Sequence, residues 1–123
     1  MVKSFISGEL KMSNYQKTDL NTEAYEPFML EDKQAGEVHW LNQTNSNDAP
    51  TFSGLWKCEP MEFDYEFPGD ETFHVLKGDL NIKLESGEEI QLSEGDVVNF
   101  KKGIKSHWRI QSSFQKFFVI HNV

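Results

Sequence analysis

Hydrophobic and polar residues alternate in short runs through the second half of the chain. In residues 80–84, Leu and Ile alternate with Asn and Lys, and residues 90–92 and 108–110 repeat this alternation. A period of two places successive side chains on opposite faces of a β-strand, so each run predicts a strand with one buried face. No segment of ten or more residues keeps a helical period. The pattern therefore predicts an all-β protein with little helix.

Glycines separate these runs at a regular interval. Gly69, Gly78, Gly87, Gly95 and Gly103 lie nine, nine, eight and eight residues apart, and several have an acidic or small neighbour. Short strands with a turn signal about every 8–12 residues are typical of an antiparallel sandwich or barrel. We therefore expect consecutive strands to be joined by tight turns at these glycines.

Strands are also predicted at both ends of this region. Residues 38–41 (VHWL) and 52–59 (FSGLWKCE) have strand character, and the polar residues 42–50 (NQTNSNDAP) between them are typical of a loop. Residues 114–123 are apolar on both faces, which is typical of a central strand covered on each side.

Residues 1–35 are polar and aperiodic, so they are predicted to form a short N-terminal arm in front of a folded domain at residues 36–123. We expect the second half of this arm to be ordered. Its apolar side chains could pack on the domain or on a second subunit: Tyr25, Phe28, Met29 and Leu30.

Composition restricts the class of protein. A chain of 123 residues suits one domain with a real core. The net charge of −8 argues against nucleic acid and anionic membranes as partners, because both attract basic surfaces. The single cysteine, Cys58, allows no internal disulfide, and the N-terminus lacks the features of a signal peptide. A cytoplasmic protein is the simplest expectation.

The candidate chemistry lies in residues 61–78 (MEFDYEFPGDETFHVLKG), where two strand-like runs flank a Pro-Gly-Asp-Glu corner. Glu71 follows the corner and is surrounded in sequence by aromatic residues: Phe63, Tyr65, Phe67 and Phe73. A carboxylate among aromatics is either fully paired or has a function, because burial disfavours its charged form.

These residues resemble the cupin family. Residues 68–78 resemble the first cupin motif, with Glu71 and Gly78 in the family's spacing, and residues 95–108 resemble the second. The match is closest to the small single-domain branch of ureidoglycine aminohydrolase-like and ethanolamine-utilisation cupins, which share the Gly-Leu-Trp pattern of residues 54–56. The resemblance covers residues 36–123. It implies a double-stranded β-helix, that is a jelly-roll barrel, which is usually dimeric and holds a ligand in its mouth.

The departures from the family pattern change the expected chemistry. The His-x-His positions of metal-binding cupins hold Tyr65 and Phe67 here, and the histidine position of the second motif holds Ser106. Strand alternation directs Asp64 and Glu66 to solvent, so an all-carboxylate site is disfavoured. We therefore expect no cofactor, with a divalent metal as the alternative.

That alternative would use Glu71 and His107 as metal ligands. Alternation places His107 on the face opposite to Ser106, so a one-residue bulge would be needed to turn it inward.

Without a metal, Glu71 is the candidate general acid/base, and Tyr65 is the candidate orienting group, because a buried hydroxyl needs a partner. The candidate ligand-binding residues are Trp56, Phe63, Phe67, Phe73 and Trp108. Aromatic residues on inward faces can equally form a filled core.

Three functions remain open, and whether the protein is an enzyme is uncertain. The first is a cupin enzyme that acts on a small polar metabolite bound in the barrel. The second is a non-catalytic metabolite-binding or accessory cupin, and the third is a structural homodimer with a filled barrel. A small-molecule ligand and a second copy of the chain are the expected partners.

Overall fold

The structure, a computed structural model, describes residues 14–44 and 50–123. Within these residues all regular elements are β-strands, which form two antiparallel sheets. The larger sheet has the order β1-β2-β3-β10-β5-β8, with the bounds β1 Glu26–Leu30, β2 Lys33–Thr44, β3 Thr51–Cys58, β10 Phe114–His121, β5 Asp70–Lys77 and β8 Val97–Phe100. The smaller sheet has the order β4-β9-β6-β7, with the bounds β4 Met61–Glu66, β9 Lys105–Ile110, β6 Leu80–Leu84 and β7 Glu89–Leu92.

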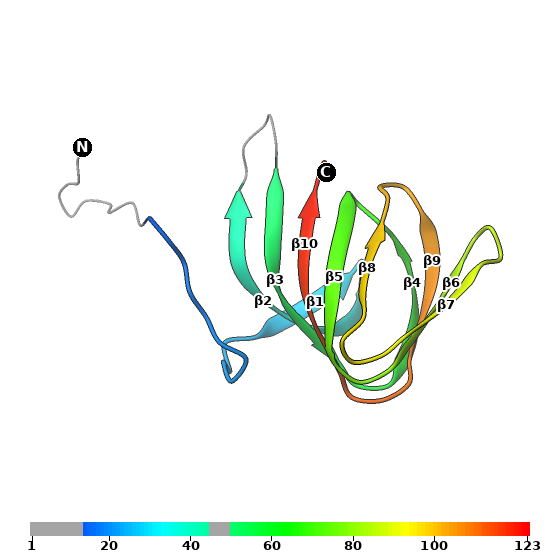
Figure 1. The fold of residues 1–123 in the computed structure, drawn as a ribbon, viewed down its shortest axis with the longest axis horizontal. Helices are drawn as coiled ribbons and strands as arrows, with labels where there is room; N and C mark the ends of the chain where they lie inside the picture. Colours follow the sequence, from blue (N-terminus) through cyan, green and yellow to red (C-terminus); the bar gives the residue numbers. More distant parts are fainter. Residues whose placement is uncertain (1–13, 45–49) are drawn as a thin grey trace.

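The two sheets face each other and enclose a barrel (Figure 1). The chain passes repeatedly between the sheets, because β4 pairs with β9 while β5 pairs with β8 and β10. This architecture is a jelly roll, so the prediction of an all-β jelly-roll barrel is confirmed. The described residues contain no helix that is long and apolar enough to cross a membrane.

The glycine positions fall at turns, as the spacing predicts. Gly78, Gly87, Gly95 and Gly103 all have positive φ angles, between 88° and 100°. Gly78 also lies against the carbonyl of Ser113, where any Cβ atom would clash with the backbone. This turn therefore needs glycine for both its conformation and its close approach to a neighbouring loop.

Strand β10 is central, as the doubly apolar pattern predicts. It pairs with β3 on one side and β5 on the other. Its even-numbered residues point into the barrel and are buried up to Ile120, whereas Phe117 and Val119 on the other face are half-buried.

The sheet begins earlier in the chain than the sequence pattern predicts. Glu26–Leu30 forms β1 and pairs with β2, so these residues join the sheet and do not belong to a separate arm. The strand predicted at residues 38–41 extends to Lys33–Thr44. The predicted loop at 42–50 includes residues 45–49, which lie outside the described residues, as does the first part of the arm at 1–13.

The part of the arm just before β1 packs on the outer face of the larger sheet. The ring of His39 makes hydrogen bonds to the carbonyl of Ala24 and the hydroxyl of Thr18, both at 2.9 Å. Tyr25 accepts a hydrogen bond from Gln115 at 3.0 Å. Thr18, Ala24 and Tyr25 therefore contact the larger sheet within this chain.

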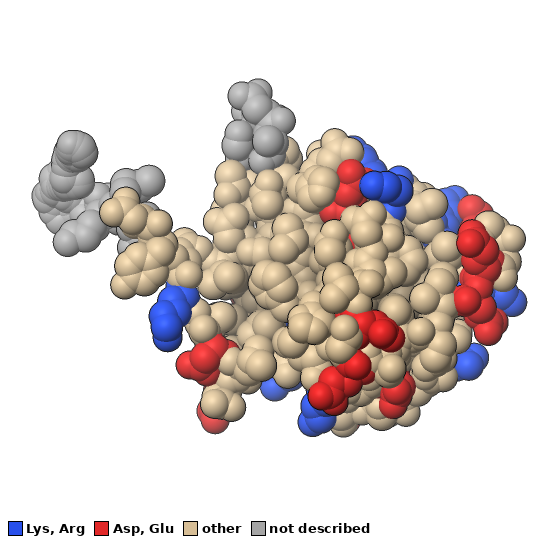
Figure 2. All heavy atoms as spheres, viewed as in Figure 1, with Lys and Arg blue, Asp and Glu red and all other residues tan. Residues whose placement is uncertain are grey.

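The same outer face is largely uncharged over β3, β10 and β5, and charged side chains gather around its edge (Figure 2). The residues in its middle rows include Leu55, Phe117 and Val119. Leu55 is buried, and the other two are half-buried.

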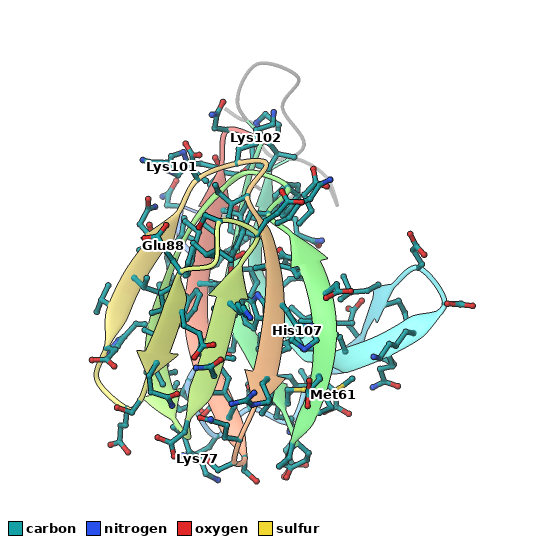
Figure 3. All side chains as sticks on the ribbon, turned by 90° about the vertical axis from the view of Figure 1, so that its right-hand side faces the viewer. Met61, Lys77, Glu88, Lys101, Lys102 and His107 are labelled. Carbon is teal, nitrogen blue, oxygen red and sulfur yellow. The ribbon has the colours of Figure 1, made fainter. Side chains whose placement is uncertain are left out.

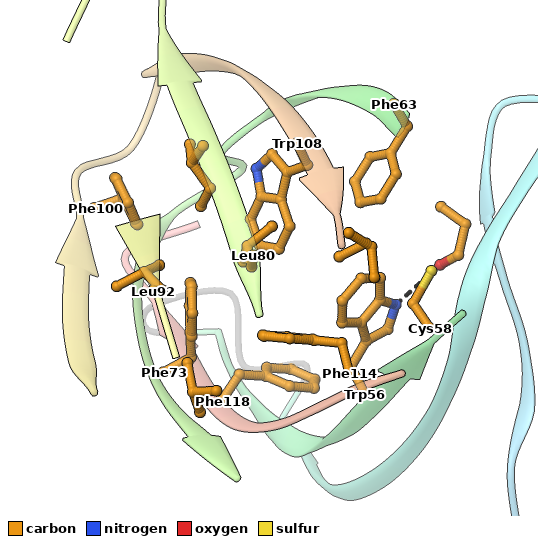
Figure 4. Packing of buried hydrophobic residues seen from close by; sticks show 14 of the residues in the cluster. Trp56, Cys58, Phe63, Phe73, Leu80, Leu92, Phe100, Trp108, Phe114 and Phe118 are labelled. Carbon is orange, nitrogen blue, oxygen red and sulfur yellow. Dashed lines mark hydrogen bonds between the residues drawn. The ribbon is translucent and has the colours of Figure 1, made fainter. Parts of the chain in front are cut away.

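Aromatic side chains pack together in the barrel interior (Figure 4). Trp108 lies at the centre, with ring centroids of four neighbours 5.5–5.8 Å away, those of Trp56, Phe63, Tyr65 and Phe73. Phe67 and Phe100 stack face to face at 4.7 Å behind this group. Packed rings of this kind hold the two sheets at a fixed separation.

Candidate functional site

A cavity of about 830 Å³ opens between strands β1 and β2 on one side and β4 on the other. Its volume lies within the usual range of ligand pockets, about 300–1,000 Å³. Its inner wall includes the aromatic rings of Trp40, Phe52, Trp56, Phe63, Trp108 and Phe118. A small barrel can fill its interior or hold one ligand, and this barrel has both a packed core and an open cavity.

Two opposite charges lie together in the wall of the cavity. The Nζ atom of Lys116, on β10, donates a hydrogen bond to Oε2 of Glu71, on β5, at 2.6 Å. The side chains are 6% and 1% exposed, so this ion pair is almost completely removed from water.

The second carboxylate oxygen of Glu71 is also bonded. The hydroxyl of Tyr65 donates to Oε1 at 3.2 Å. Burial, and then the neighbouring negative charge of Glu71, raise the pKa of the Tyr65 hydroxyl, so this group stays a neutral donor. Glu71, Tyr65 and Lys116 thus form one connected polar group on the cavity wall, which we call the polar triad.

Sheet pairing explains how Lys116 reaches Glu71. Glu71 is paired with Ile120, and Lys116 is paired with Val75 further along the same two strands. The lysine side chain therefore runs along the inner face of the sheet, and its ammonium group lies 4.3 Å from the ring centroid of Phe73 and 5.5 Å from that of Phe118.

Four aromatic rings surround the ammonium group in all. The other two belong to Trp108, at 4.6 Å, and Trp56, at 5.1 Å. Ring faces attract a cation, which partly replaces the lost hydration. Burial nevertheless dominates and lowers the pKa of Lys116, while the charge and hydrogen bond of Glu71 oppose this shift.

Neighbouring hydrogen bonds hold the wall of the site in place. Ser106 donates to the carbonyl oxygen of Tyr65 at 2.6 Å and accepts from the indole of Trp108 at 2.9 Å. Asn99 donates to the side chain of Thr72 at 2.9 Å and, more weakly, to the carbonyl of Glu71 at 3.4 Å. These bonds restrict the orientation of Tyr65 and of the strand that carries Glu71.

Most of the predicted site residues meet at the cavity. Glu71, Tyr65, Trp56, Phe63 and Trp108 all line it. The structure places the remaining two candidates elsewhere. Phe67 and Phe73 are each 1% exposed and lie in the packed core, because neighbouring rings separate them from the open space.

His107 lies on the opposite side of the barrel wall from Glu71. It projects from β9 on the outer face of the smaller sheet (Figure 3) and bonds to Glu62 and Asp64, each at 2.8 Å. β9 has no bulge that would turn it inward, since its register with β4 is continuous. A metal site shared by Glu71 and His107 is therefore ruled out, because the sheet separates the two side chains.

The residues around Glu71 do not fit a divalent metal. Both of its oxygens accept hydrogen bonds, and one of them is already bonded to an ammonium group, which would repel a second cation. Ser106 is engaged with Tyr65 and Trp108. Among residues 14–44 and 50–123, no group of three or more His, Cys, Asp or Glu side chains could hold an ion.

Lys116 is the residue of the polar triad that the sequence pattern did not identify. A lysine in a strand with two apolar faces is expected to point to solvent, because lysine is rarely buried. Lys116 has the same parity as Phe114, Phe118 and Ile120, which all point inward, but the opposite face of this strand is also apolar, so the sequence did not show which face is interior. Its pairing with Glu71, 45 positions away, could not be read from the sequence.

The exposed edge of the cavity is mainly acidic. Glu31 and Asp32 lie on the side of the β1–β2 turn, and Asp64 and Glu66 lie on β4. Lys33 is the basic member of this exposed edge and donates to the carbonyl of Glu62 at 2.8 Å. The entrance therefore disfavours ligands with a net negative charge.

Comparison with known families identifies the class of protein. The sequence profile of the EutQ-like cupin domain matches residues 46–118, which is more than half of the chain. The chain belongs to this cupin family, and the resemblance stated from the sequence motifs is confirmed. Among curated proteins, none matches the sequence significantly.

Solved structures show the same fold. A DUF861 family protein from Thermotoga maritima is 30% identical, with a TM-score of 0.51 over 52% of this chain and 73% of that protein. A putative ethanolamine utilisation protein Q from Salmonella typhimurium is 23% identical, with a TM-score of 0.59 over 68% and 67%. The Clostridium difficile EutQ protein is 18% identical, with a TM-score of 0.61 over 90% and 79%.

Proposed function

We propose that this protein binds a small molecule in the aromatic cavity and acts on it with the polar triad. The observation that carries this proposal is the placement of a buried ion pair in the wall of a largely apolar cavity. Pockets that recognise metabolites combine apolar walls with a few fixed polar groups. The ligand's apolar part would lie against the rings, and its polar group would contact Glu71 and Lys116.

The proposed roles follow from the geometry. Glu71 is the general acid/base, because its carboxylate already accepts hydrogen bonds from two proton donors. Lys116 supplies positive charge next to the reacting group, and Tyr65 orients the carboxylate. Proton transfer of this kind supports hydrolysis, isomerisation or decarboxylation. The site is proposed to work without a metal cofactor.

A non-catalytic sensor or accessory subunit is the second candidate. It would use the same cavity and triad for recognition alone. The volume of the cavity supports either candidate over a structural dimer with a filled barrel, since a filled barrel would leave no space for a ligand.

A thermal-shift screen of small metabolites tests the proposal. A ligand at 100 times its dissociation constant should stabilise the wild-type protein by about 2.7 kcal/mol. Glu71→Gln should reduce or abolish this shift, whereas the matched control Glu89→Gln, on the exposed face of β7, should preserve it. If no metabolite shifts the unfolding temperature, the binding proposal is wrong. Turnover of a bound ligand then separates the enzyme from the sensor.

Metal analysis tests the cofactor proposal separately. Protein purified without a histidine tag should carry a transition metal in fewer than about a tenth of its chains, because the donor set is poor. Stoichiometric metal that is lost in Glu71→Gln would contradict the proposal.

We also propose a homodimer in a reducing, cytoplasmic compartment. The support for a dimer is the largely uncharged outer face of the larger sheet, where Val97 is 66% exposed and Phe117 and Val119 are half-buried. The support for the compartment is that Cys58 is a free, buried thiol. A single monomer-sized species in light scattering at micromolar concentration would overturn the dimer.

A further inference from the structure

Lys116 differs from every other lysine that the structure describes. The others within residues 14–44 and 50–123 are exposed, whereas Lys116 is 5% exposed and lines the cavity. Its amine therefore stands where a bound molecule would meet it, away from bulk water. A lysine in an apolar pocket is a recognised nucleophile once it has lost its proton.

A proton acceptor for that amine is already in place. Oε2 of Glu71 lies 2.6 Å from Nζ. Both charged side chains are almost completely buried, so the charged pair loses much of its advantage over the neutral amine and carboxylic acid. The four surrounding rings favour the ammonium form at rest. Transfer of one proton over one hydrogen bond makes the amine nucleophilic without exposing it to water.

We propose that Lys116 forms a reversible imine with uncharged aldehydes or ketones that enter the cavity, and that Glu71 carries the proton. This inference deepens the proposed function and rests on it. The aromatic wall suits a carbonyl compound with an apolar body, and the acidic entrance disfavours keto acids.

The atoms and protons of the reaction balance. Glu71 takes a proton from the Lys116 ammonium group, and the freed electron pair forms a bond to the carbonyl carbon. A proton moves from nitrogen to the former carbonyl oxygen and gives a neutral carbinolamine. Glu71 then returns its proton to the hydroxyl group, the carbon–oxygen bond breaks, and water leaves. The product is a protonated imine that faces the restored carboxylate, with no change in oxidation state.

Reductive trapping of the wild-type protein tests the inference. The protein is incubated at pH 7 with benzaldehyde and sodium cyanoborohydride, which converts an imine into a stable benzylamine, and the modified lysines are mapped by mass spectrometry. Each unit by which a lysine pKa is lowered increases its neutral amine about tenfold at neutral pH. Because burial lowers the pKa of Lys116, this lysine should be modified faster than the exposed Lys77. Modification of Lys77 with Lys116 unmodified would overturn the inference.

Variants and an unreactive analogue sharpen this test. Lys116→Met should lose the fast modification and keep the slow modification of the exposed lysines. The matched control Lys77→Met should lose only the modification at position 77. If Lys116→Met does not fold, the wild-type map still decides the question. If benzyl alcohol, which has no carbonyl group, raises the unfolding temperature while Lys116 resists benzaldehyde, the imine is wrong and the binding proposal stands. If neither compound binds or reacts, both proposals fall for this class of ligand.

Discussion

Strand β4 contributes side chains to two polar clusters, one on each of its faces. On the inner face, Tyr65 bonds to Glu71, which is paired with Lys116. On the outer face, Glu62 and Asp64 both bond to His107. We call the second group the outer cluster. Both clusters join carboxylates to a basic side chain, and their hydrogen bonds to it are 2.6–2.8 Å long.

The two clusters differ in their contact with water. Glu71 and Lys116 are 1% and 6% exposed, whereas His107, Glu62 and Asp64 are 45%, 55% and 90% exposed. Water and salt screen the outer charges, so an exposed pair contributes only about 0–1 kcal/mol. The inner charges have no such screening. Hydrogen bonds of similar length can therefore have very different consequences when they are broken.

The pKa values of the two basic groups shift in opposite directions because His107 is exposed and Lys116 is buried. Hydrogen bonds to Glu62 and then to Asp64 raise the pKa of His107, because burial opposes them only weakly. For Lys116 burial is the largest cause, and it lowers the pKa in spite of the adjacent carboxylate. The inner site thus favours proton transfer, whereas the outer cluster favours a retained proton.

The largest expected effect is that of breaking the inner pair. Lys116→Met should lower the free energy of unfolding by about 3–5 kcal/mol at pH 7, because it leaves the Glu71 carboxylate buried without its cation. Urea unfolding measures this loss. A change below about 1 kcal/mol would show that the inner pair resembles an exposed one.

The double variant Glu71→Gln with Lys116→Met provides the control. It removes both charges, so it should be more stable than Lys116→Met and lie within about 1–2 kcal/mol of wild type. Equal destabilisation of the single and double variants would indicate that lost packing, and not the unpaired charge, causes the effect.

A smaller effect is expected for Tyr65→Phe. The phenylalanine ring keeps the aromatic contacts, but Glu71 loses the hydrogen bond at 3.2 Å. A hydrogen bond to a charged group contributes about 1.5–3 kcal/mol. Because this hydrogen bond is long, we expect a loss of about 1.5 kcal/mol in the free energy of unfolding. Chemical denaturation measures it, and Tyr15→Phe, at an exposed position, is the matched control. No measurable loss would mean that Tyr65 does not support the carboxylate.

The smallest expected effect belongs to the outer cluster. The pKa of His107 is raised on folding, so its contribution is fully present below the unfolded value of about 6.5 and is lost as the pH rises through the folded value. His107→Gln should therefore cost no more than about 1 kcal/mol at pH 5.5 and almost nothing at pH 9. Urea unfolding at the two pH values, with and without added salt, measures this difference. A cost that is independent of pH would contradict the charged interaction.

Much of the candidate site could be predicted from the alternation of β4 and the cupin corner. Tyr65 and Phe63 face inward, Asp64 and Glu66 face outward, and Ser106 and Trp108 lie opposite to His107. Alternation alone places each of these side chains because each strand has one apolar face. Alternation does not distinguish the wall of a cavity from a packed core. Phe67 and Phe73 are therefore predicted as ligand-binding residues together with Trp56, although only Trp56 lines the cavity.

Strand β1 shows a second limit of the sequence pattern. Glu26–Leu30 is a short edge strand with only partly buried side chains. Its sequence carries little periodic signal, and its place in the sheet depends on pairing with β2. Residues in β1 nevertheless form one side of the cavity, so the size of the cavity depends on a pairing that the sequence pattern does not reveal.

By itself the sequence determined the fold class, the turns and the family, because strand alternation, glycine conformation and the cupin motifs are local properties of the chain. It also determined that Glu71 is an inward carboxylate. Only the tertiary structure decided what that carboxylate meets. In β10 both faces are apolar, so parity does not tell which face is interior, and the sheet order places β10 beside β5. That neighbourhood brings the ammonium group of Lys116 to Glu71 and makes the site an ion pair in an aromatic cavity.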